Sequence, residues 1–204
     1  IKLQMNMKPK QIKILLVIAI SASISAFSQI SSAQDFKPVS QDILNNPDPE
    51  DWLMWRGSYE NWGYSPLTEI NQDNVDQLRL AWSWEFAPAA PGSNGMQVEP
   101  TVYDGVMYIR HSNEKYSAHN AATGDLIWQY SRTLAAEVAG YETRLTVHRG
   151  RGVFIYEDKL ISHSTDGMLF ALNPRDGSLI WEVAMQDFRS GQQPSGAPVA
   201  YGGS

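Results

Sequence analysis

The sequence predicts an all-β fold, a β-propeller assembled from repeated units that each end in a tryptophan. Two segments, Tyr103–Trp128 and Tyr156–Trp181, align without a gap at a constant offset of 53 residues. Within each segment, short β-prone runs alternate with turn sequences rich in Asn, Asp and Gly. A period near 50 residues is typical of one supersecondary unit per repeat, as in the blades of a propeller.

Four strands are expected in each unit, and the first leads into the tyrosine that opens the aligned segment. The other three are expected at 106–110, 116–120 and 126–130 in the first unit, and at 159–164, 169–173 and 179–183 in the second. The sequences NAATGD and NPRDGS separate the last two strands. Their Asn, Asp and Gly residues tolerate the positive φ that a tight hairpin needs.

A third unit begins near the end of the chain, where residues 197–203 (APVAYGG) match residues 99–105 (EPTVYDG). Two complete units cannot close a ring, and they would leave strand edges open. We therefore expect the functional protein to be longer, with only an N-terminal segment and about two to three blades represented by these 204 residues.

Tryptophans recur at fixed places in the units. Trp128 and Trp181 could stack on a ligand, but their equivalent positions favour packing between units. Trp52, Trp55 and Trp62 lie before the repeats in a segment rich in turn residues, and we expect them to pack as well.

The first 33 residues have the layout of a secretory signal. Three lysines between positions 8 and 13 precede an apolar run at 14–20, and small residues at 31–33 place the cleavage site before Gln34. A membrane anchor is the alternative, but the apolar run is far shorter than the roughly 20 residues that span a bilayer. We expect export to the periplasm without stable membrane insertion, and a mature domain that begins at residue 34.

Charge and cysteine content exclude several classes of function. Residues 1–33 hold four of the 16 basic residues and none of the 22 acidic ones, so the remainder carries a net charge of about −10. Such an acidic body repels phosphate backbones, and nucleic acid is not an expected partner. The chain has no cysteine, which excludes disulfides, thiolate metal sites and thiol catalysis.

Several motifs together resemble the opening of the methanol- and ethanol-type dehydrogenases that depend on pyrroloquinoline quinone (PQQ). The opening motif DWLMWRG at 51–57 is followed by GYSPLTEIN at 63–71. Further matching pieces occur in the same order, at residues 104–108, 122–128, 151–156 and 195–198. The repeat alone is shared by non-catalytic propellers, and the opening motif makes the resemblance more specific.

This resemblance implies an eight-bladed propeller that holds PQQ near its axis beside Ca²⁺ or a lanthanide. In that family a small alcohol is oxidised to an aldehyde by hydride transfer to the quinone, with an aspartate as base, and electrons pass to a cytochrome c. The catalytic aspartate and the metal ligands would lie beyond Ser204. We therefore assign no catalytic or metal-binding residue here, and we expect the chain by itself to be inactive.

Three polar residues share one phase of the repeat and are the candidate cofactor-binding residues. Gln97 lies six residues before Tyr103, Arg151 five before Tyr156, and Ser195 six before Tyr201. In a propeller whose first strands line the axis, these side chains would converge at one end of the central channel. Taken singly, they could equally be a surface amide, a solvated loop charge and an ordinary residue at a strand entrance.

The resemblance assigns roles to the same three positions. Arg151 matches an arginine that contacts the quinone oxygens, Ser195 matches a hydroxyl that bonds the cofactor, and Gln97 stands where many members carry a cofactor-binding Glu. An arginine fork suits a ligand with three carboxylates and a dione. Leu145-Thr146 stands where many members have adjacent cysteines, which leaves the redox detail and the substrate range open.

Two alternatives to the enzyme remain at this level. One is a non-catalytic propeller of the same repeat type that serves as a periplasmic assembly or binding scaffold; such scaffolds are typically lipoproteins, which the absence of Cys disfavours. The other is the inactive product of a truncated gene. The four histidines show no metal-ligand spacing, and strand or loop positions account for them: His111, His119, His148 and His163.

Overall fold

The computed structural model of the chain describes residues 36–85, 97–112, 114–134, 137–138, 151–190 and 196–203. The expected signal segment lies outside these residues. No helix within the described ranges has both the length and the apolar character needed to cross a membrane.

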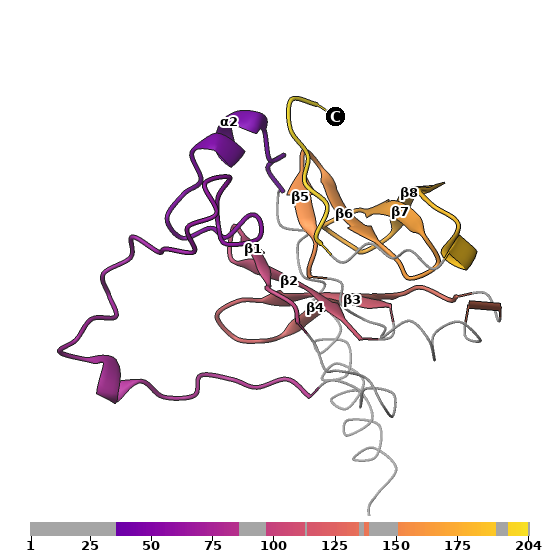
Figure 1. Ribbon diagram of the computed structural model, residues 1–204. Helices are drawn as coiled ribbons and strands as arrows, with labels where there is room; N and C mark the ends of the chain where they lie inside the picture. Colours follow the sequence, from indigo (N-terminus) through magenta and orange to yellow (C-terminus); the bar gives the residue numbers. More distant parts are fainter. Residues whose placement is uncertain are drawn as a thin grey trace, which may run out of the picture. The chain divides into compact units, whose positions relative to one another are not determined.

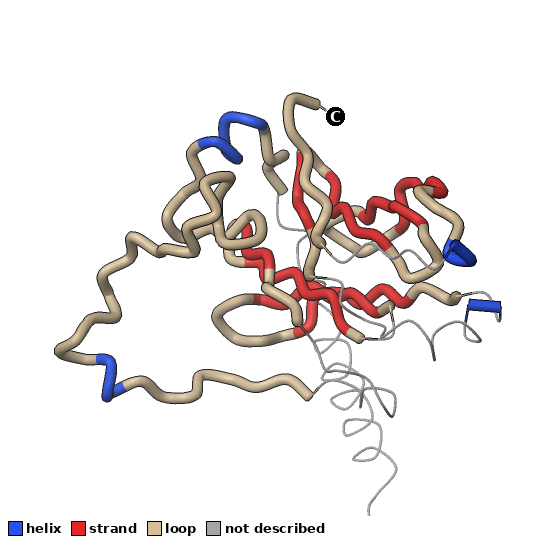
Figure 2. The backbone as a smooth tube through the Cα atoms, in the orientation of Figure 1, coloured by secondary structure: helices blue, strands red, loops and turns tan. Residues whose placement is uncertain are grey.

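Each repeat forms one four-stranded antiparallel sheet in which the strands follow one another in sequence order (Figures 1 and 2). The first sheet contains β1 (Thr101–Tyr103), β2 (Val106–His111), β3 (Lys115–Asn120) and β4 (Leu126–Ser131). The second contains β5 (Phe154–Tyr156), β6 (Lys159–His163), β7 (Met168–Leu172) and β8 (Leu179–Ala184). The expected strands are confirmed to within one residue at each end. The expected unit of four strands per repeat is confirmed as well.

The turns before the last strands have the same structure in both repeats. The Asn120 side chain accepts hydrogen bonds from the backbone N–H groups of Ala122 and Thr123, both at 3.0 Å. Asn173, 53 residues later, accepts one from Arg175 N–H at 3.0 Å. These side-chain bonds replace backbone pairing at the tip of the hairpin, which explains why Asn opens both turns.

A tryptophan from the preceding part of the chain sits on each of these turns. Trp82 Nε1 donates to the carbonyl of Ala121 at 3.0 Å, and Trp128 Nε1 donates to the carbonyl of Pro174 at 2.8 Å. The two acceptors are themselves 53 residues apart. Trp128 is 7 % exposed, so its expected role in packing between units is confirmed. We call this contact the tryptophan seat.

Glycine is required under each seated ring. A β-carbon on Gly124 would lie 2.6 Å from the ring of Trp82, and one on Gly177 would lie 2.5 Å from that of Trp128. Both glycines have positive φ, 76° and 73°. The turn therefore needs glycine both for its backbone conformation and for the close approach of the indole.

The two sheets share one apolar core. Tyr116 and Phe170, both fully buried, meet edge to face with ring centroids 5.3 Å apart. The Thr101 hydroxyl donates to the carbonyl of Val153 at 2.8 Å, which ties the first strand of one repeat to the entrance of the next. Aromatic pairs of this geometry add stabilisation beyond the area that they bury.

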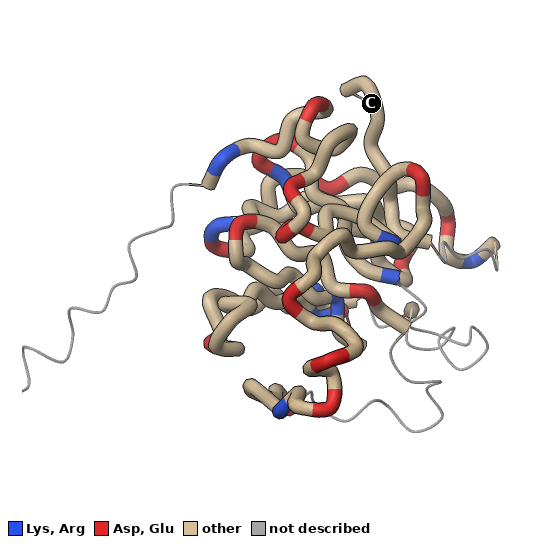
Figure 3. The backbone as a smooth tube through the Cα atoms, turned by 90° about the vertical axis from the view of Figure 1, so that its left-hand side faces the viewer, with Lys and Arg blue, Asp and Glu red and all other residues tan. Residues whose placement is uncertain are grey.

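Segments outside the strands attach to the edges of both sheets. Val39 and Glu157 exchange two backbone hydrogen bonds, of 2.9 and 2.8 Å, beside β5. The helix α2 (Gln41–Asn45) follows, with Ser40 as its N-cap. The 3₁₀ turns η1 (Val75–Gln77) and η2 (Phe188–Ser190) are short. Acidic positions are spread over the described chain with basic ones between them (Figure 3).

We expect Gly177→Ala to lower the free energy of unfolding of the native protein by about 3 kcal/mol, since the methyl group meets the Trp128 ring and the backbone stays at positive φ. Gly105→Ala is the matched control, because Gly105 has φ 72° but nothing within 4 Å of its β-carbon position. That change should cost only the backbone strain, about 1 kcal/mol. Equal losses in urea unfolding would show that the seat contributes nothing.

Candidate cofactor-binding site

The opening motif, residues 51–57, lies along the first strand of the first repeat. Trp52 and Val102 exchange two backbone hydrogen bonds, of 2.8 and 2.9 Å, so the motif extends the sheet at its β1 edge. The Asp51 carboxylate accepts a hydrogen bond from Asp104 N–H at 3.0 Å. Burial raises the pKa of Asp51, and this hydrogen bond partly opposes the rise. The motif is thus attached both to β1 and to the turn that follows it.

Glu99, at the entrance to β1, binds the turn of the opening motif. Its Oε1 accepts hydrogen bonds from Trp52 Nε1–H and from Arg56 N–H, the second at 3.0 Å. A carboxylate that accepts two such bonds is held in one orientation. Trp55 lies between these two anchored residues, so the backbone is held on both sides of Trp55.

Arg151 lies against the ring of Trp55. Its guanidinium carbon is 5.4 Å from the ring centroid, within the range of a cation–π interaction. No carboxylate among the described residues forms an ion pair with this guanidinium, whereas Arg110 and Arg132 both have acidic partners. Arg151 therefore combines a fixed position with a charge that the described part of the chain leaves uncompensated.

The entrances to β1 and β5 are in backbone contact beside this arginine. Glu99 N–H donates to the carbonyl of Arg151 at 3.5 Å. Gly152 follows with φ 132°, and a β-carbon there would lie 2.9 Å from the carbonyl oxygen of Glu99. Any side chain at residue 152 would push the two strand entrances apart, so glycine is needed to keep Glu99 and Arg151 adjacent.

The structure describes two of the three candidate residues, and their surroundings differ. Arg151 is half-buried and held as described, and Gln97 is exposed, two residues before Glu99. Ser195 lies outside the described residues, as do Leu145, Thr146 and His148. The contact between Glu99 and Arg151 brings the first two strand entrances together. The convergence of all three side chains stays a prediction.

Sequence reasoning missed two residues of this site. Glu99 lies two residues after Gln97 in the segment that leads into β1, so the alternation of side chains in an extended segment offered a signal for it. Trp55 was expected to pack, and its contact with a cation 96 positions later in the chain leaves no local signal. The expected packing of Trp62 is wrong in the described structure, because that side chain is 78 % exposed.

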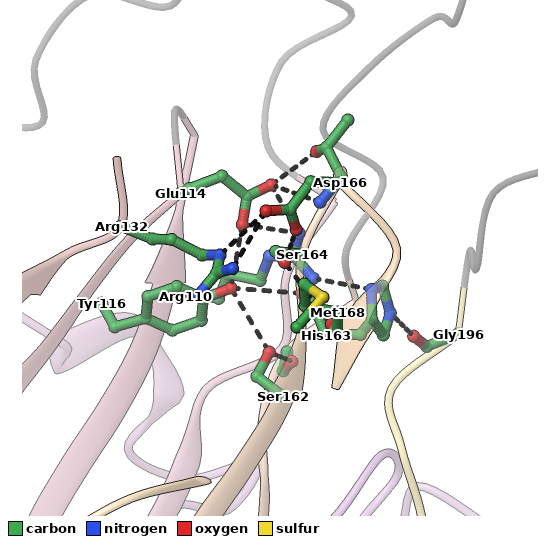
Figure 4. A network of polar contacts seen from close by, with 12 residues as sticks. Arg110, Glu114, Tyr116, Arg132, Ser162, His163, Ser164, Asp166, Met168 and Gly196 are labelled. Carbon is green, nitrogen blue, oxygen red and sulfur yellow. Dashed lines mark hydrogen bonds and ion pairs between the residues drawn. The ribbon is translucent and has the colours of Figure 1, made fainter. Parts of the chain in front are cut away.

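A second group of polar side chains is buried between the two sheets (Figure 4). Glu114, 1 % exposed, pairs with Arg110 at 3.2 Å and accepts hydrogen bonds from the Thr165 N–H at 3.1 Å and the Tyr116 hydroxyl at 3.2 Å. Arg110 Nη1 also contacts His163 Nδ1 at 3.4 Å. A buried ion pair needs such additional bonds, because desolvation of the two charges is costly.

The partners of His163 determine its tautomer. Arginine only donates, so Nδ1 of His163 is the acceptor, and Nε2–H donates to the carbonyl of Gly196 at 2.6 Å. Burial and the nearby Arg110 lower the pKa of His163 to about 4, so the ring is neutral near pH 7. A continuous chain of polar contacts thus runs from Glu114 through Arg110 and His163 to the beginning of the third unit.

These groups stabilise the junction between repeats and offer no site for a metal. Arg132 pairs with Asp166 at 3.0 Å and with Glu182 at 2.6 Å, and it lies 5.6 Å above the Phe170 ring. Within the described ranges, no three His, Asp or Glu side chains are grouped so that they could hold a metal ion.

Comparison with known proteins shows the family to which the chain belongs. The protein-family model for the PQQ-containing β-propeller domain of glucose, ethanol and alcohol dehydrogenases matches residues 52–197. The chain belongs to this family. The match begins at Trp52, in the opening motif, and ends at Ala197, in the third unit. The predicted resemblance to PQQ-dependent dehydrogenases is confirmed.

Curated relatives from this quinoprotein family are similar over most of the chain. The dehydrogenase subunit of a quinone alcohol dehydrogenase from Gluconobacter oxydans is 34 % identical over 172 residues, which is 84 % of this chain and 22 % of the relative. A quinoprotein ethanol dehydrogenase from Pseudomonas aeruginosa is 32 % identical over 136 residues, 67 % of this chain and 21 % of the relative. The chain spans about a fifth of the length of these relatives.

Solved structures of the same family share the fold. A quinohemoprotein alcohol dehydrogenase from Pseudomonas putida matches with a TM-score of 0.64 and 29 % identity, over 74 % of this chain and 22 % of that one. A europium-containing methanol dehydrogenase matches with a TM-score of 0.63 and 26 % identity, over 78 % of this chain and 28 % of that one. The two described sheets therefore correspond to part of a longer propeller.

Removal of the Glu114 carboxylate should strongly destabilise the native protein. Glu114→Ala leaves the buried Arg110 without its acidic partner, and we expect a loss of about 3–5 kcal/mol in the free energy of unfolding. Glu182→Ala is the control, because Glu182 is exposed and Arg132 keeps Asp166; that loss should stay below about 1 kcal/mol. Similar losses in urea unfolding would contradict a special role for the buried pair.

The neutral His163 ring should make stability fall in acid. Its pKa is about 4 in the folded protein and about 6.5 when unfolded, so the unfolded state binds more protons between these values. The contribution of the neutral His163 to the free energy of unfolding is therefore fully present above about pH 6.5, and it declines as the pH falls toward 4. His163→Gln should flatten this decline in melting temperature and leave a residual slope from His111, whose pKa is also about 4. An unchanged pH profile would refute the assignment.

Proposed function

We propose that the protein containing this chain is a PQQ-dependent alcohol dehydrogenase, and that residues 34–204 form the N-terminal part of its propeller. The family match over residues 52–197 carries this proposal. The relatives named above support it, since they are quinone-dependent alcohol and ethanol dehydrogenases. Because the chain covers about a fifth of their length, the activity belongs to the whole protein.

The residues of the candidate site fit the chemistry of PQQ. PQQ carries three carboxylates and a dione, and Arg151 offers forked donors whose charge the described residues leave uncompensated. Gln97 adds an exposed amide that can donate or accept a hydrogen bond, and Ser195 adds a hydroxyl. When bound, the quinone supplies the acceptor for the hydride of the alcohol. This chain's part is to bind and orient that cofactor.

The remaining parts of the reaction belong to residues outside this chain. Ca²⁺ or a lanthanide would be held there and would act as a Lewis acid, and an aspartate would serve as base. A relative of known structure is a europium-containing methanol dehydrogenase, which supports a place for such a metal. We propose a small alcohol as substrate, a cytochrome c as electron acceptor, and the periplasm as location, reached through the signal at residues 1–33.

The test is reconstitution of the native full-length protein. Purified without cofactor and supplied with PQQ and Ca²⁺ or a lanthanide, it should oxidise primary alcohols with an artificial electron acceptor, and chelation of the metal should abolish the activity. Residues 34–204 expressed alone should be inactive. A full-length protein that binds neither PQQ nor metal and oxidises no alcohol would refute the dehydrogenase and favour the scaffold function.

A further inference from the structure

Among the described residues, the guanidinium of Arg151 is held differently from those of Arg110 and Arg132, the two other arginines that are buried or half-buried. Arg110 and Arg132 are fixed by carboxylates, at 3.2 Å from Glu114 and 3.0 Å from Asp166. Within the described part of the chain, Arg151 lies instead over the face of Trp55, with its guanidinium carbon 5.4 Å from the ring centroid. A carboxylate neutralises the charge that it holds, whereas an aromatic face attracts the cation and leaves its net charge in place.

The turn that carries Trp55 is itself held by hydrogen bonds to one carboxylate. Trp52 Nε1–H and Arg56 N–H, on either side of it, both donate to Glu99 Oε1. The backbone of Glu99 in turn contacts the backbone of Arg151 at 3.5 Å. One residue, Glu99, therefore fixes both the turn that carries the indole and the strand entrance that carries the guanidinium.

We propose that Trp55 is a positioning residue that presents Arg151, whose charge no described residue compensates, to a carboxylate-bearing quinone. This inference rests on the proposed function and goes beyond it, because it assigns to the opening motif a direct part in cofactor affinity. The aromatic face orients the plane of the guanidinium, so its N–H donors are directed before the ligand arrives. Preorganisation of this kind raises affinity by reducing the ordering cost of binding.

The experiment measures the Kd of PQQ for the cofactor-free full-length protein by titration calorimetry at saturating Ca²⁺. Trp55→Leu removes the aromatic face and should raise the Kd about 3- to 30-fold, the range expected for a cation–π interaction. Trp55→Phe keeps a smaller face and should raise it less. In an Arg151→Ala background, Trp55→Leu should have no further effect, since there is no cation left to position.

A matched control separates this role from a general effect of tryptophan loss. Trp62→Leu changes an exposed indole that lies outside the cation–π contact, and the Kd should be unchanged. An unchanged Kd in Trp55→Leu, or an equal rise with and without Arg151, would overturn the inference. An Arg151→Ala protein that binds PQQ as tightly as the native one would instead refute Arg151 as a cofactor residue. Failure of the native protein to bind PQQ would refute the proposed function itself.

Discussion

The seat of a tryptophan on a glycine turn is the contact on which the rest of this structure depends. Each sheet is a four-stranded antiparallel meander whose central strands bury consecutive residues, and a single repeat of this kind cannot bury its apolar surface without a neighbouring unit. The seat fixes the next unit at a defined distance. The indole N–H of Trp128 donates to the carbonyl of Pro174, and its ring packs directly on the backbone of Gly177. Once the units are held, Tyr116 can meet Phe170 and the polar groups between the sheets can find partners.

The opening motif adds a second constraint, at the β1 edge of the first sheet. The seat acts at the turn before the last strand, whereas Trp52 pairs with the first strand at Val102. The first strands must end close together for a shared site to form at their entrances, and Glu99 with Gly152 keeps them so. The architecture and the candidate site are therefore built by separate sets of contacts, which allows the repeat to be common among propellers while the site differs.

The sequence predicted what local chemistry determines. Strand limits followed from turn residues such as Asn120 and Gly124, whose turn conformation depends on neighbours within five positions. The packing of Trp128 followed from its recurrence. The contact of Trp55 with Arg151 and the pairing of Arg110 with His163 could not be predicted, because each joins separate segments through the fold. The position of Arg151 within the repeat predicted that it lies at a strand entrance, but Trp55, whose ring it contacts, lies outside the repeat.

The seat of Trp128 joins two unlike surfaces, the closing strand of one unit and the turn of the next. In terms of symmetry the contact is heterologous, so a row of units has a direction and two different ends. A heterologous contact gives a closed ring only if the rotation from one unit to the next divides a full circle, and it gives an open helix otherwise. The contact between the indole and the glycine turn therefore does more than stabilise a pair of blades. In a closed propeller, the rotation that this contact sets between neighbouring units would determine the number of blades.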